Sequence, residues 1–261
     1  MLHKRRSEII EKVRMYRMVK VQDLMKEYNV SIETIRRDLE YLENEGYLKR
    51  VYGGAVLPGF YGQEPDFTHR EIVNYEEKIA IGTKTATMIN DGDTLMMDVG
   101  TTVLEVANCL RDKKNLTVIT NSTLIASKMA TYNDCRVILL GGDLRPGELS
   151  VSGILAEQNL DRYYANKMIM GVGGITLANG ITDYHSGEAS VRRKMLDRSE
   201  RVIAVADCCK FGVTALNAIC PISRLSGIVT DWTLPHETIK EYKDGGITLT
   251  ISDNNQDKEQ S

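Results

Sequence analysis

The sequence predicts an α/β protein with a small N-terminal domain, the head (residues 1–57), and a larger domain with a mainly parallel sheet, the body (residues 76–251). Two observations favour this division. Across the body, short apolar runs rich in β-branched residues alternate with helical patterns, which is typical of a parallel sheet with helices on both faces. In the head, three helical patterns precede a β-ribbon pattern with two adjacent glycines. The 261 residues suffice for two domains with hydrophobic cores.

The rest of the chain is a joining stretch, residues 58–75, and a polar end, residues 252–261. The joining stretch contains two prolines and two glycines without clean periodicity, so we expect a boundary loop. Its aromatic residues are Phe60, Tyr61 and Phe67. Such apolar residues are unusual in a freely exposed linker, which favours their packing on a neighbouring domain or subunit. We expect the polar end to be disordered.

Composition excludes several classes of protein. No apolar run approaches the length of about 18 residues that a transmembrane helix needs, so no membrane partner is expected. The basic start of the chain lacks the apolar core and cleavage site of a secretory signal. The five cysteines are odd in number and lack a C-x-x-C pair, which argues against a disulfide framework or metal site and favours a reducing cytoplasm. No cofactor is predicted.

Charge is distributed unevenly between the two domains. Residues 1–58 hold 12 of the 33 Lys and Arg and 9 of the 36 Asp and Glu, a balance of +3. The remainder holds 21 against 27, a balance of −6. Nucleic acid is therefore a candidate partner of the head alone. The alternative interpretation is a solvated helix face.

The helical patterns of the head are typical of a helix-turn-helix at about residues 20–39. The second pattern covers Val21–Tyr28, a tight turn follows, and Ser31 stands at the expected N-cap of the third helix. In such motifs the last helix enters the major groove of DNA with its first residues on base edges. Spacing alone leaves this interpretation open, because any three-helix bundle could share it. The apolar face of the third helix consists of Ile32, Ile35, Leu39 and Leu42.

The opposite face of the third helix supplies the candidate DNA-binding residues. Arginine suits guanine O6 and N7 or a bidentate phosphate contact. Arg37 has two open roles, contact with DNA or pairing with Asp38 or Glu33. A β-ribbon over residues 47–56 then forms a wing whose basic side chains would meet phosphates. The candidates are Ser31, Thr34, Arg36, Arg37, Lys49 and Arg50.

Seven strands are expected in the body, and polar or glycine-rich residues follow five of them. The carboxyl ends of parallel strands meet at one edge of the sheet, where open α/β folds bind ligands. Small and hydroxyl residues there expose backbone N–H groups at helix N-termini, which suits a phosphate. The strands are Thr94–Met97, Leu116–Ile119, Val137–Leu140, Met168–Met170, Val202–Ala206, Ile228–Val229 and Ile247–Ile251. The candidates at their ends are Asp98, Gly100, Thr101, Thr102, Asn121, Ser122, Gly141, Gly142, Gly171, Gly173 and Lys210.

Two sets of motifs carry a family resemblance. The head has Ser31-x-x-Thr34-Ile35-Arg36-Arg37-Asp38-Leu39 and Arg50-x-x-Gly53-Gly54-Ala55. The body has Asp98-x-Gly100-Thr101-Thr102, Gly141-Gly142-x-Leu144-Arg145, Gly180-x-x-Asp183-Tyr184-His185 and Asp207-x-x-Lys210-Phe211-Gly212. On these residues the whole chain resembles the DeoR family of bacterial transcription regulators.

The resemblance implies a winged helix-turn-helix head and a sugar-phosphate sensor body similar in fold to ribose-5-phosphate isomerase. It implies that residues 100–102 and Lys210 hold the phosphate, while Asp98, Asn121, Asp183 and Glu188 meet hydroxyls or order the site. Arg145 lies in a matching stretch and joins the candidate site. His185 has two open roles, contact with the ligand and capping of a helix.

The function implied is that of a transcription regulator, most simply a repressor of a sugar or polyol catabolic operon. It would bind double-stranded operator DNA as a homodimer or homotetramer, under control of a phosphorylated sugar or polyol. An activator differs only in operator position, which the protein sequence does not contain.

An active sugar-phosphate isomerase with an accessory head is the alternative. Isomerases carry an acidic stretch where this chain has Gly171-Val172-Gly173-Gly174. Aldose–ketose isomerisation needs carboxylates to move protons, so the chain is not expected to be an enzyme, and Glu188 is left as a lone candidate base. The pair Cys208-Cys209 departs from the DeoR pattern and allows redox sensitivity or inert packing.

Overall fold

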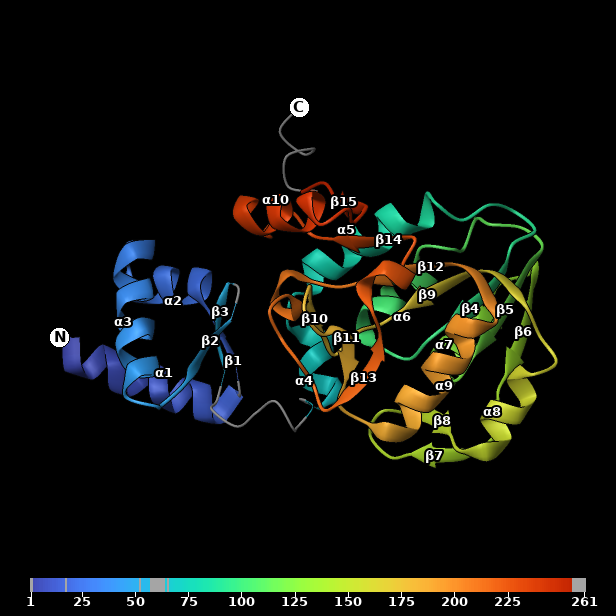
Figure 1. The fold of residues 1–261 in the computed structure, drawn as a ribbon, viewed down its shortest axis with the longest axis horizontal. Helices are drawn as coiled ribbons and strands as arrows, with labels where there is room; N and C mark the ends of the chain where they lie inside the picture. The colour runs from blue at the N-terminus through green and yellow to red at the C-terminus, as the bar shows by residue number, and fades with distance from the viewer. Residues whose placement is uncertain (1, 17, 52, 57–63, 65, 255–261) are drawn as a thin grey trace.

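The computed structural model describes residues 2–16, 18–51, 53–56, 64 and 66–254. Phe60, Tyr61 and the chain from residue 255 onward lie outside the described residues, so the expectations placed on them stay predictions. The protein is α/β, with an N-terminal helix-turn-helix domain beside a domain built on a seven-stranded sheet (Figure 1). Within the described chain no helix is long and apolar enough to cross a membrane.

The head is a three-helix bundle with a small antiparallel sheet. Its helices are α1 (Leu2–Tyr16), α2 (Val21–Tyr28) and α3 (Ile32–Asn44), and its strands are β1 (Met18–Lys20), β2 (Lys49–Val51) and β3 (Gly54–Val56). The strand order is β1-β3-β2, so the expected wing gains a third strand that the sequence did not predict. The apolar face of α3 packs on α1 and α2, with Ile35, Leu39 and Leu42 buried together with Ile9 and Leu24.

The turn between α2 and α3 forms as predicted. Asn29 adopts a left-handed conformation (φ 48°) that ends α2, which asparagine tolerates better than most residues. The hydroxyl of Ser31 then accepts a hydrogen bond from the backbone N–H of Thr34, which caps α3. In the wing, a Cβ at Gly54 would lie 2.0 Å from the carbonyl oxygen of Val19, so β1 can pair with β3 only when residue 54 is glycine.

Asp38 connects α3 to α1 through two ion pairs. Its carboxylate is 1% exposed and accepts hydrogen bonds from Arg5 Nε at 2.6 Å and Arg6 Nε at 2.8 Å. A buried charge needs such partners, because its desolvation is otherwise costly. The partners of Asp38 are thus the arginines of α1, and Arg37 is exposed rather than paired with its neighbour.

The seven predicted strands form one parallel sheet in the order β15-β14-β12-β9-β4-β5-β6. The chain starts in the middle at β4, adds β5 and β6 on one side, and then returns to add β9 and the remaining strands on the other. The topological switch point therefore lies between β4 and β9. The strands are β4 (Thr94–Met97), β5 (Leu116–Thr120), β6 (Cys135–Leu139), β9 (Ala165–Met170), β12 (Ser199–Val205), β14 (Gly227–Thr230) and β15 (Leu249–Ile251).

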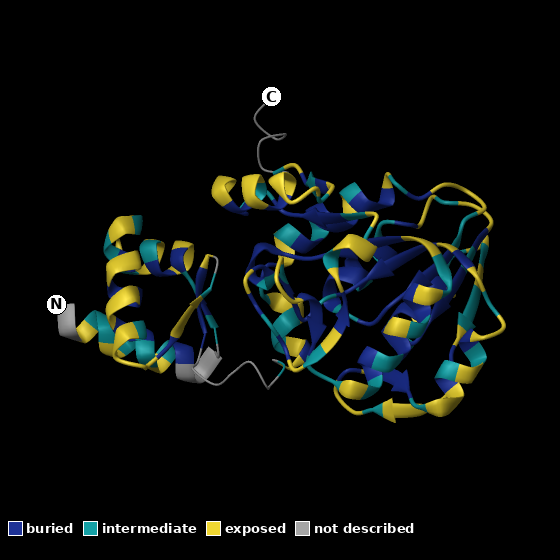
Figure 2. Cartoon of the chain, viewed as in Figure 1, coloured by how far each residue is buried: buried dark blue, intermediate teal, exposed yellow. Residues whose placement is uncertain are grey.

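Helices cover both faces of this sheet, and the sheet interior is buried (Figure 2). One core joins α5 (Tyr75–Ala86), α6 (Thr101–Asn108) and α7 (Thr123–Met129) to inward residues such as Leu95 and Met97. The other core joins α8 (Ile154–Leu160), α9 (Ser186–Asp197) and α10 (His236–Asp244) to residues such as Met96. Successive side chains of β4 therefore point to opposite faces of the sheet and pack into the two cores in turn.

Short elements that the sequence did not predict decorate the carboxyl edge of the sheet. Strands β7 (Asp143–Arg145) and β8 (Ser150–Ser152) form a hairpin, and β10 (Gly174–Thr176), β11 (Gly180–Asp183) and β13 (Asn217–Cys220) form a second antiparallel sheet. Short 3-10 turns occupy Cys208–Lys210 and Ile222–Arg224.

The stretch expected to be a loop contains helix α4 (Phe67–Ile72). Phe67 is 8% exposed, so its ring is packed against other residues, as we expected for an apolar residue of the joining stretch. Six residues are too few to show a helical period, and tertiary packing decides the conformation here.

Candidate functional site

The candidate DNA-binding residues lie on the outer face of α3 and on the wing. Ser31, Arg36 and Arg37 are exposed and Thr34 is half-buried. Within the described chain neither Arg36 nor Arg37 has an ion-pair partner. Both guanidinium groups are therefore available to an outside anion.

The two basic residues of the wing differ in their surroundings. Arg50 Nε donates to Glu43 Oε2 at 2.6 Å, and its backbone N–H donates to Glu43 Oε1 at 2.8 Å. Burial alone would raise the pKa of Glu43, but these hydrogen bonds lower it. Arg50 thereby fastens the wing to α3 while its guanidinium stays partly exposed, and Lys49 is exposed beside it.

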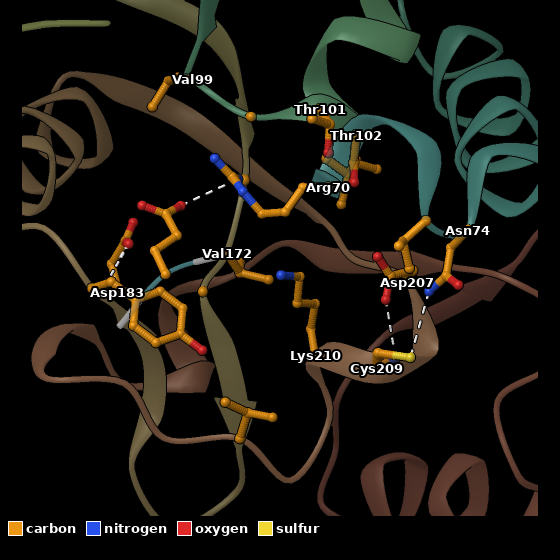
Figure 3. A pocket seen from close by; sticks show the side chains of 18 of the residues that line it. Arg70, Asn74, Val99, Thr101, Thr102, Val172, Asp183, Asp207, Cys209 and Lys210 are labelled. Carbon is orange, nitrogen blue, oxygen red and sulfur yellow. Dashed lines mark hydrogen bonds and ion pairs between the residues drawn. The ribbon is translucent and has the colours of Figure 1, made fainter. Parts of the chain in front are cut away.

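A cavity opens at the switch point between β4 and β9 (Figure 3). Its walls come from the loops that follow these two strands, from the start of α9, and from the turn at Cys208–Lys210. Further walls come from α4 and α5 and, on the head, from Met18 and Val56. The ligand site that parallel topology predicts is therefore closed on one side by the DNA-binding domain.

Eight of the fifteen candidate ligand-binding residues line this cavity: Gly100, Thr101, Thr102, Gly171, Gly173, Asp183, Glu188 and Lys210. They come from four segments that are far apart in the sequence: the start of α6, the loop after β9, the region from β11 to α9, and the turn at Cys208–Lys210. Helix α6 starts at Thr101, and no side chain caps its first N–H groups. An uncapped helix N-terminus attracts an anion.

Glycine is required where the two strand-end loops approach each other. A Cβ at Gly171 would lie 2.8 Å from the carbonyl oxygen of Val99, and one at Gly173 would lie 3.0 Å from Asp183 Cα. A larger residue at either position would push the loops apart. The glycine-rich stretch thus permits a narrow cavity floor.

Four Lys and Arg side chains line the cavity, namely Arg70, Lys78, Arg192 and Lys210, and only Lys210 was predicted. Arg70 reaches in from α4, and Lys210 points in from the opposite loop (Figure 3). Lys78 of α5 is 3% exposed and donates to the carbonyl oxygens of Arg70 and Val73. Burial lowers the pKa of Lys78 to about 8; Asp207 opposes this shift, and the like charges of Lys210 and Arg70 add to it.

Buried ion pairs support the floor of the cavity. Arg192 of α9 bridges Asp98 and Asp183, and Asp98 is fully buried. Burial raises the pKa of Asp98, which the charge of Arg192 opposes. Asp98 therefore does not line the cavity, but it orders the site through its ion pair with Arg192.

Glu188 is held on two sides. It accepts from Ser150 Oγ at 2.5 Å and from Arg145 Nη1 at 3.0 Å. Arg145 does not line the cavity but positions this carboxylate.

The remaining candidates lie outside the cavity lining and have structural contacts. His185 Nδ1 accepts from the N–H of Glu188 and Ser122 Oγ accepts from that of Ile125, so each caps a helix. A Cβ at Gly142 would lie 2.3 Å from the carbonyl oxygen of Ser152, and Gly141 is exposed. Asn121 is fully buried, and neither polar atom of its amide has a partner in the described chain.

The adjacent cysteines lie between the cavity and the wing. Their sulfurs are 3.8 Å apart and buried, and Asn74 Nδ2 donates to Cys209 Sγ at 3.4 Å. The hydrogen bond between Cys208 and Cys209 and then burial raise the pKa of Cys208. Protonated, buried thiols are poor nucleophiles, which favours packing over redox sensitivity.

Several cavity residues escaped the sequence reasoning. Arg70, Asn74 and Lys78 belong to the joining stretch and the first body helix, where no strand end drew attention. Glu148 sits in an unpredicted hairpin, and Arg192 lies in a helix interior. Asp207 alone had a signal, since it directly follows a strand in one of the quoted motifs.

A helix-turn-helix head with exposed arginines, closing the ligand cavity of an α/β body, defines a two-domain DNA-binding regulator. The chain belongs to the DeoR family of transcription regulators. Residues 5–59 match the DeoR-like helix-turn-helix domain, and residues 73–232 match the DeoR C terminal sensor domain.

Relatives of similar length support this assignment. The HTH-type transcriptional regulator YulB of Bacillus subtilis is 36% identical over 94% of this chain and 95% of its own. The glycerol-3-phosphate regulon repressor of Escherichia coli is 32% identical over 95% of this chain and 98% of its own.

A ribose 5-phosphate isomerase from Methanocaldococcus jannaschii aligns at 12% identity and a TM-score of 0.39, covering 53% of this chain and 55% of its own.

Proposed function

We propose that the chain represses an operon for sugar or polyol catabolism and that a phosphorylated sugar or polyol in the body cavity controls its affinity for operator DNA. The observation that carries the proposal is the cavity itself, in which a helix N-terminus and cationic side chains face carboxylates (Figure 3). Similar relatives are named as repressors, one of them of a glycerol-3-phosphate regulon.

The chemistry of the cavity suits a ligand with an anionic end and a hydroxyl-bearing end. The first N–H groups of α6, with the Thr101 and Thr102 hydroxyls and the Lys210 ammonium, would hold the phosphate. Asp183 and Glu188 line another part of the cavity and would accept hydrogen bonds from hydroxyls.

Control of DNA binding requires two states with different affinity for the ligand. Met18 and Val56 of the head line the cavity, so a ligand there would directly change how the DNA-binding domain packs against the body. Helix-turn-helix proteins read paired half-sites as symmetric oligomers, so we propose a homodimer or homotetramer.

Thermal unfolding against a panel of phosphorylated sugars and polyols tests the ligand class. A ligand at a hundredfold excess over its Kd stabilises the folded state by about 2.7 kcal/mol. Lys210→Met should abolish the shift, whereas Lys240→Met, at an exposed position of α10, should keep it. Stabilisation by unphosphorylated sugars alone would contradict the phosphate site. The stabilising compound should also change operator affinity in the wild type.

The cavity offers little to the isomerase alternative. A carboxylate side chain at Gly171 would collide with the carbonyl oxygen of Val99, and the carboxylates of Asp183 and Glu188 are engaged by arginines. Proton transfer between carbon and oxygen needs a carboxylate free to act as a base. We expect no formation of ribulose 5-phosphate from ribose 5-phosphate; turnover abolished by Glu188→Gln would reverse this conclusion.

A further inference from the structure

Glu64 belongs to the stretch that joins the head to the body, and its side chain is drawn into the body. Its Oε1 lies 3.1 Å from Arg70 Nη1, and its Oε2 lies 3.0 Å from Arg145 Nη1. The side chain is only 10% exposed, against 14% and 25% for the two arginines. A carboxylate with both oxygens engaged by guanidinium groups is a strong, oriented contact.

The same arginines also hold two carboxylates of the body. Arg70 pairs with Glu148, and Arg145 Nη1 pairs with Glu188 Oε1 at 3.0 Å. Burial raises the pKa of Glu148, and Glu64 and Glu188 add to the rise while Arg70 opposes it. Three carboxylates therefore share two guanidinium groups, and Glu64 is the one that belongs to the joining stretch.

The cluster borders the cavity that the head closes. Glu64, Arg70, Glu148 and Glu188 line it together with Met18 and Val56 of the head sheet. Among the described residues, Lys20 of the head also forms an ion pair with Glu77 of the body, with Nζ 3.3 Å from Oε1. The contacts of Glu64 thus lie in the same cavity wall as Met18 and Val56 of the head.

We propose that Glu64 is an internal competitor of the anionic ligand. In the free protein its carboxylate occupies the two arginines at the cavity wall, which Met18 and Val56 of the head also line. A phosphate that attracts Arg70 weakens this contact and favours release of the head. The inference rests on the proposed function, since it requires an anion in this cavity, and it identifies the contact through which the anion acts.

Competition of this kind lowers the apparent affinity for the ligand. The ligand-competent state is only partly populated while Glu64 holds the arginines, so the apparent affinity is lower than the intrinsic one. Removing the charge of Glu64 should raise the affinity and loosen the head even without ligand.

The test compares full-length Glu64→Gln with the wild type and with Glu71→Gln, which removes an exposed carboxylate of α4. The readouts are amide hydrogen exchange in β1, β3 and α4 without ligand, and the Kd of inorganic phosphate by calorimetry. We expect Glu64→Gln to exchange faster in these segments and to bind phosphate about fivefold or more tightly, within the usual range of coupling. Glu71→Gln should match the wild type in both.

Unchanged exchange in Glu64→Gln would overturn the proposal even if phosphosugars bind and control operator affinity. Faster exchange with unchanged phosphate affinity would overturn the competition. The proposed function fails separately, if phosphosugars leave the operator affinity of the wild type unchanged. Glu64→Asp keeps the charge but is too short to reach both arginines, so it should fall between the other variants and serves if Glu64→Gln does not fold.

Discussion

Arg36 and Arg37 stand next to Asp38 in the sequence, yet the three side chains have different tasks. Asp38 turns inward to Arg5 and Arg6 and fastens α3 to α1, while both arginines face solvent. Two basic residues of α1 therefore neutralise a buried acid and do not add to a DNA-binding surface. We expect the basic residues of α3 and the wing to contact the DNA.

Arg36→Ala tests this division of tasks. Loss of a base-reading arginine costs about 1–3 kcal/mol of specific binding and relaxes the preference at one base pair. We expect operator affinity to fall while affinity for random DNA changes less, measured by fluorescence anisotropy. Arg111→Ala, an exposed arginine of the body, is the matched control and should leave both unchanged. Equal operator affinity of Arg36→Ala and wild type would contradict the assignment.

We expect Lys78 to make ligand binding depend on pH. Its pKa is lowered to about 8, so the folded protein holds fewer protons than the unfolded chain between about pH 8 and the ordinary value of 10.5. The folded state accordingly gains stability as the pH rises through this window, because the cost of a buried ammonium disappears.

An anion in the cavity favours the charged form of Lys78 and should take up a proton on binding. We expect the affinity for a phosphosugar to fall between pH 7.5 and 9.5, by at most about tenfold per pH unit for one linked proton. Calorimetry in buffers of different ionisation enthalpy measures the uptake. Lys78→Arg should remove the dependence, because arginine stays charged. A wild-type affinity independent of pH would count against this role.

At the scale of elements, helix α5 packs against α6 through a glycine. A Cβ at Gly82 would lie 2.7 Å from the carbonyl oxygen of Glu105 and 2.8 Å from its carbonyl carbon. This close approach fixes the position of α6, whose N-terminus faces the cavity. Local helix propensity would prefer alanine here, so the tertiary contact decides the residue.

Gly82→Ala should therefore destabilise the body despite the better helix former. Overpacking of this kind costs about 1–3 kcal/mol. Urea unfolding should show a lower midpoint with an unchanged slope, and ligand binding should weaken because α6 is displaced. Thr83→Ala, one residue further on the exposed side of α5, is the control and should change the midpoint little. A midpoint equal to or above that of the wild type would show that the helices can separate freely.

The whole molecule presents opposite charges at its two ends. Residues 1–58 have a balance of +3 and the remainder of the chain has one of −6, so we expect the head to turn toward the DNA backbone and the rest of the chain away from it. We therefore expect ionic contacts of the head to contribute much of the affinity for DNA, and counterion release to set the dependence of this affinity on salt.

Operator affinity should accordingly fall log-linearly as salt rises from about 50 to 200 mM, as for other proteins that neutralise phosphates. Lys49→Gln should lower the slope by about one unit if this wing residue contacts a phosphate, and should affect specific and random DNA alike. Lys240→Gln on the body is the control. A slope unchanged by Lys49→Gln would place the wing away from the backbone.

The sequence by itself determined the elements with strong local signals. The seven strands of the large sheet, the Ser31 cap and the basic face of α3 all follow from periodicity and capping, which act over a few residues. Six of the predicted ligand residues line the cavity because the ends of parallel strands share an edge, and the family resemblance predicted two more, Asp183 and Glu188. Short elements such as α4 and β1 carry too few residues to show a period.

Only the tertiary structure decided which strand ends meet. The switch point between β4 and β9 brings Gly100 and Gly171 together, while Asn121 and Gly141 follow strands on the far side and stay outside the cavity lining. It also brought Glu64, Arg70 and Lys78 to the cavity from a stretch without strand signals. Contacts between residues distant in the chain depend on strand order and helix packing, which local sequence patterns do not encode.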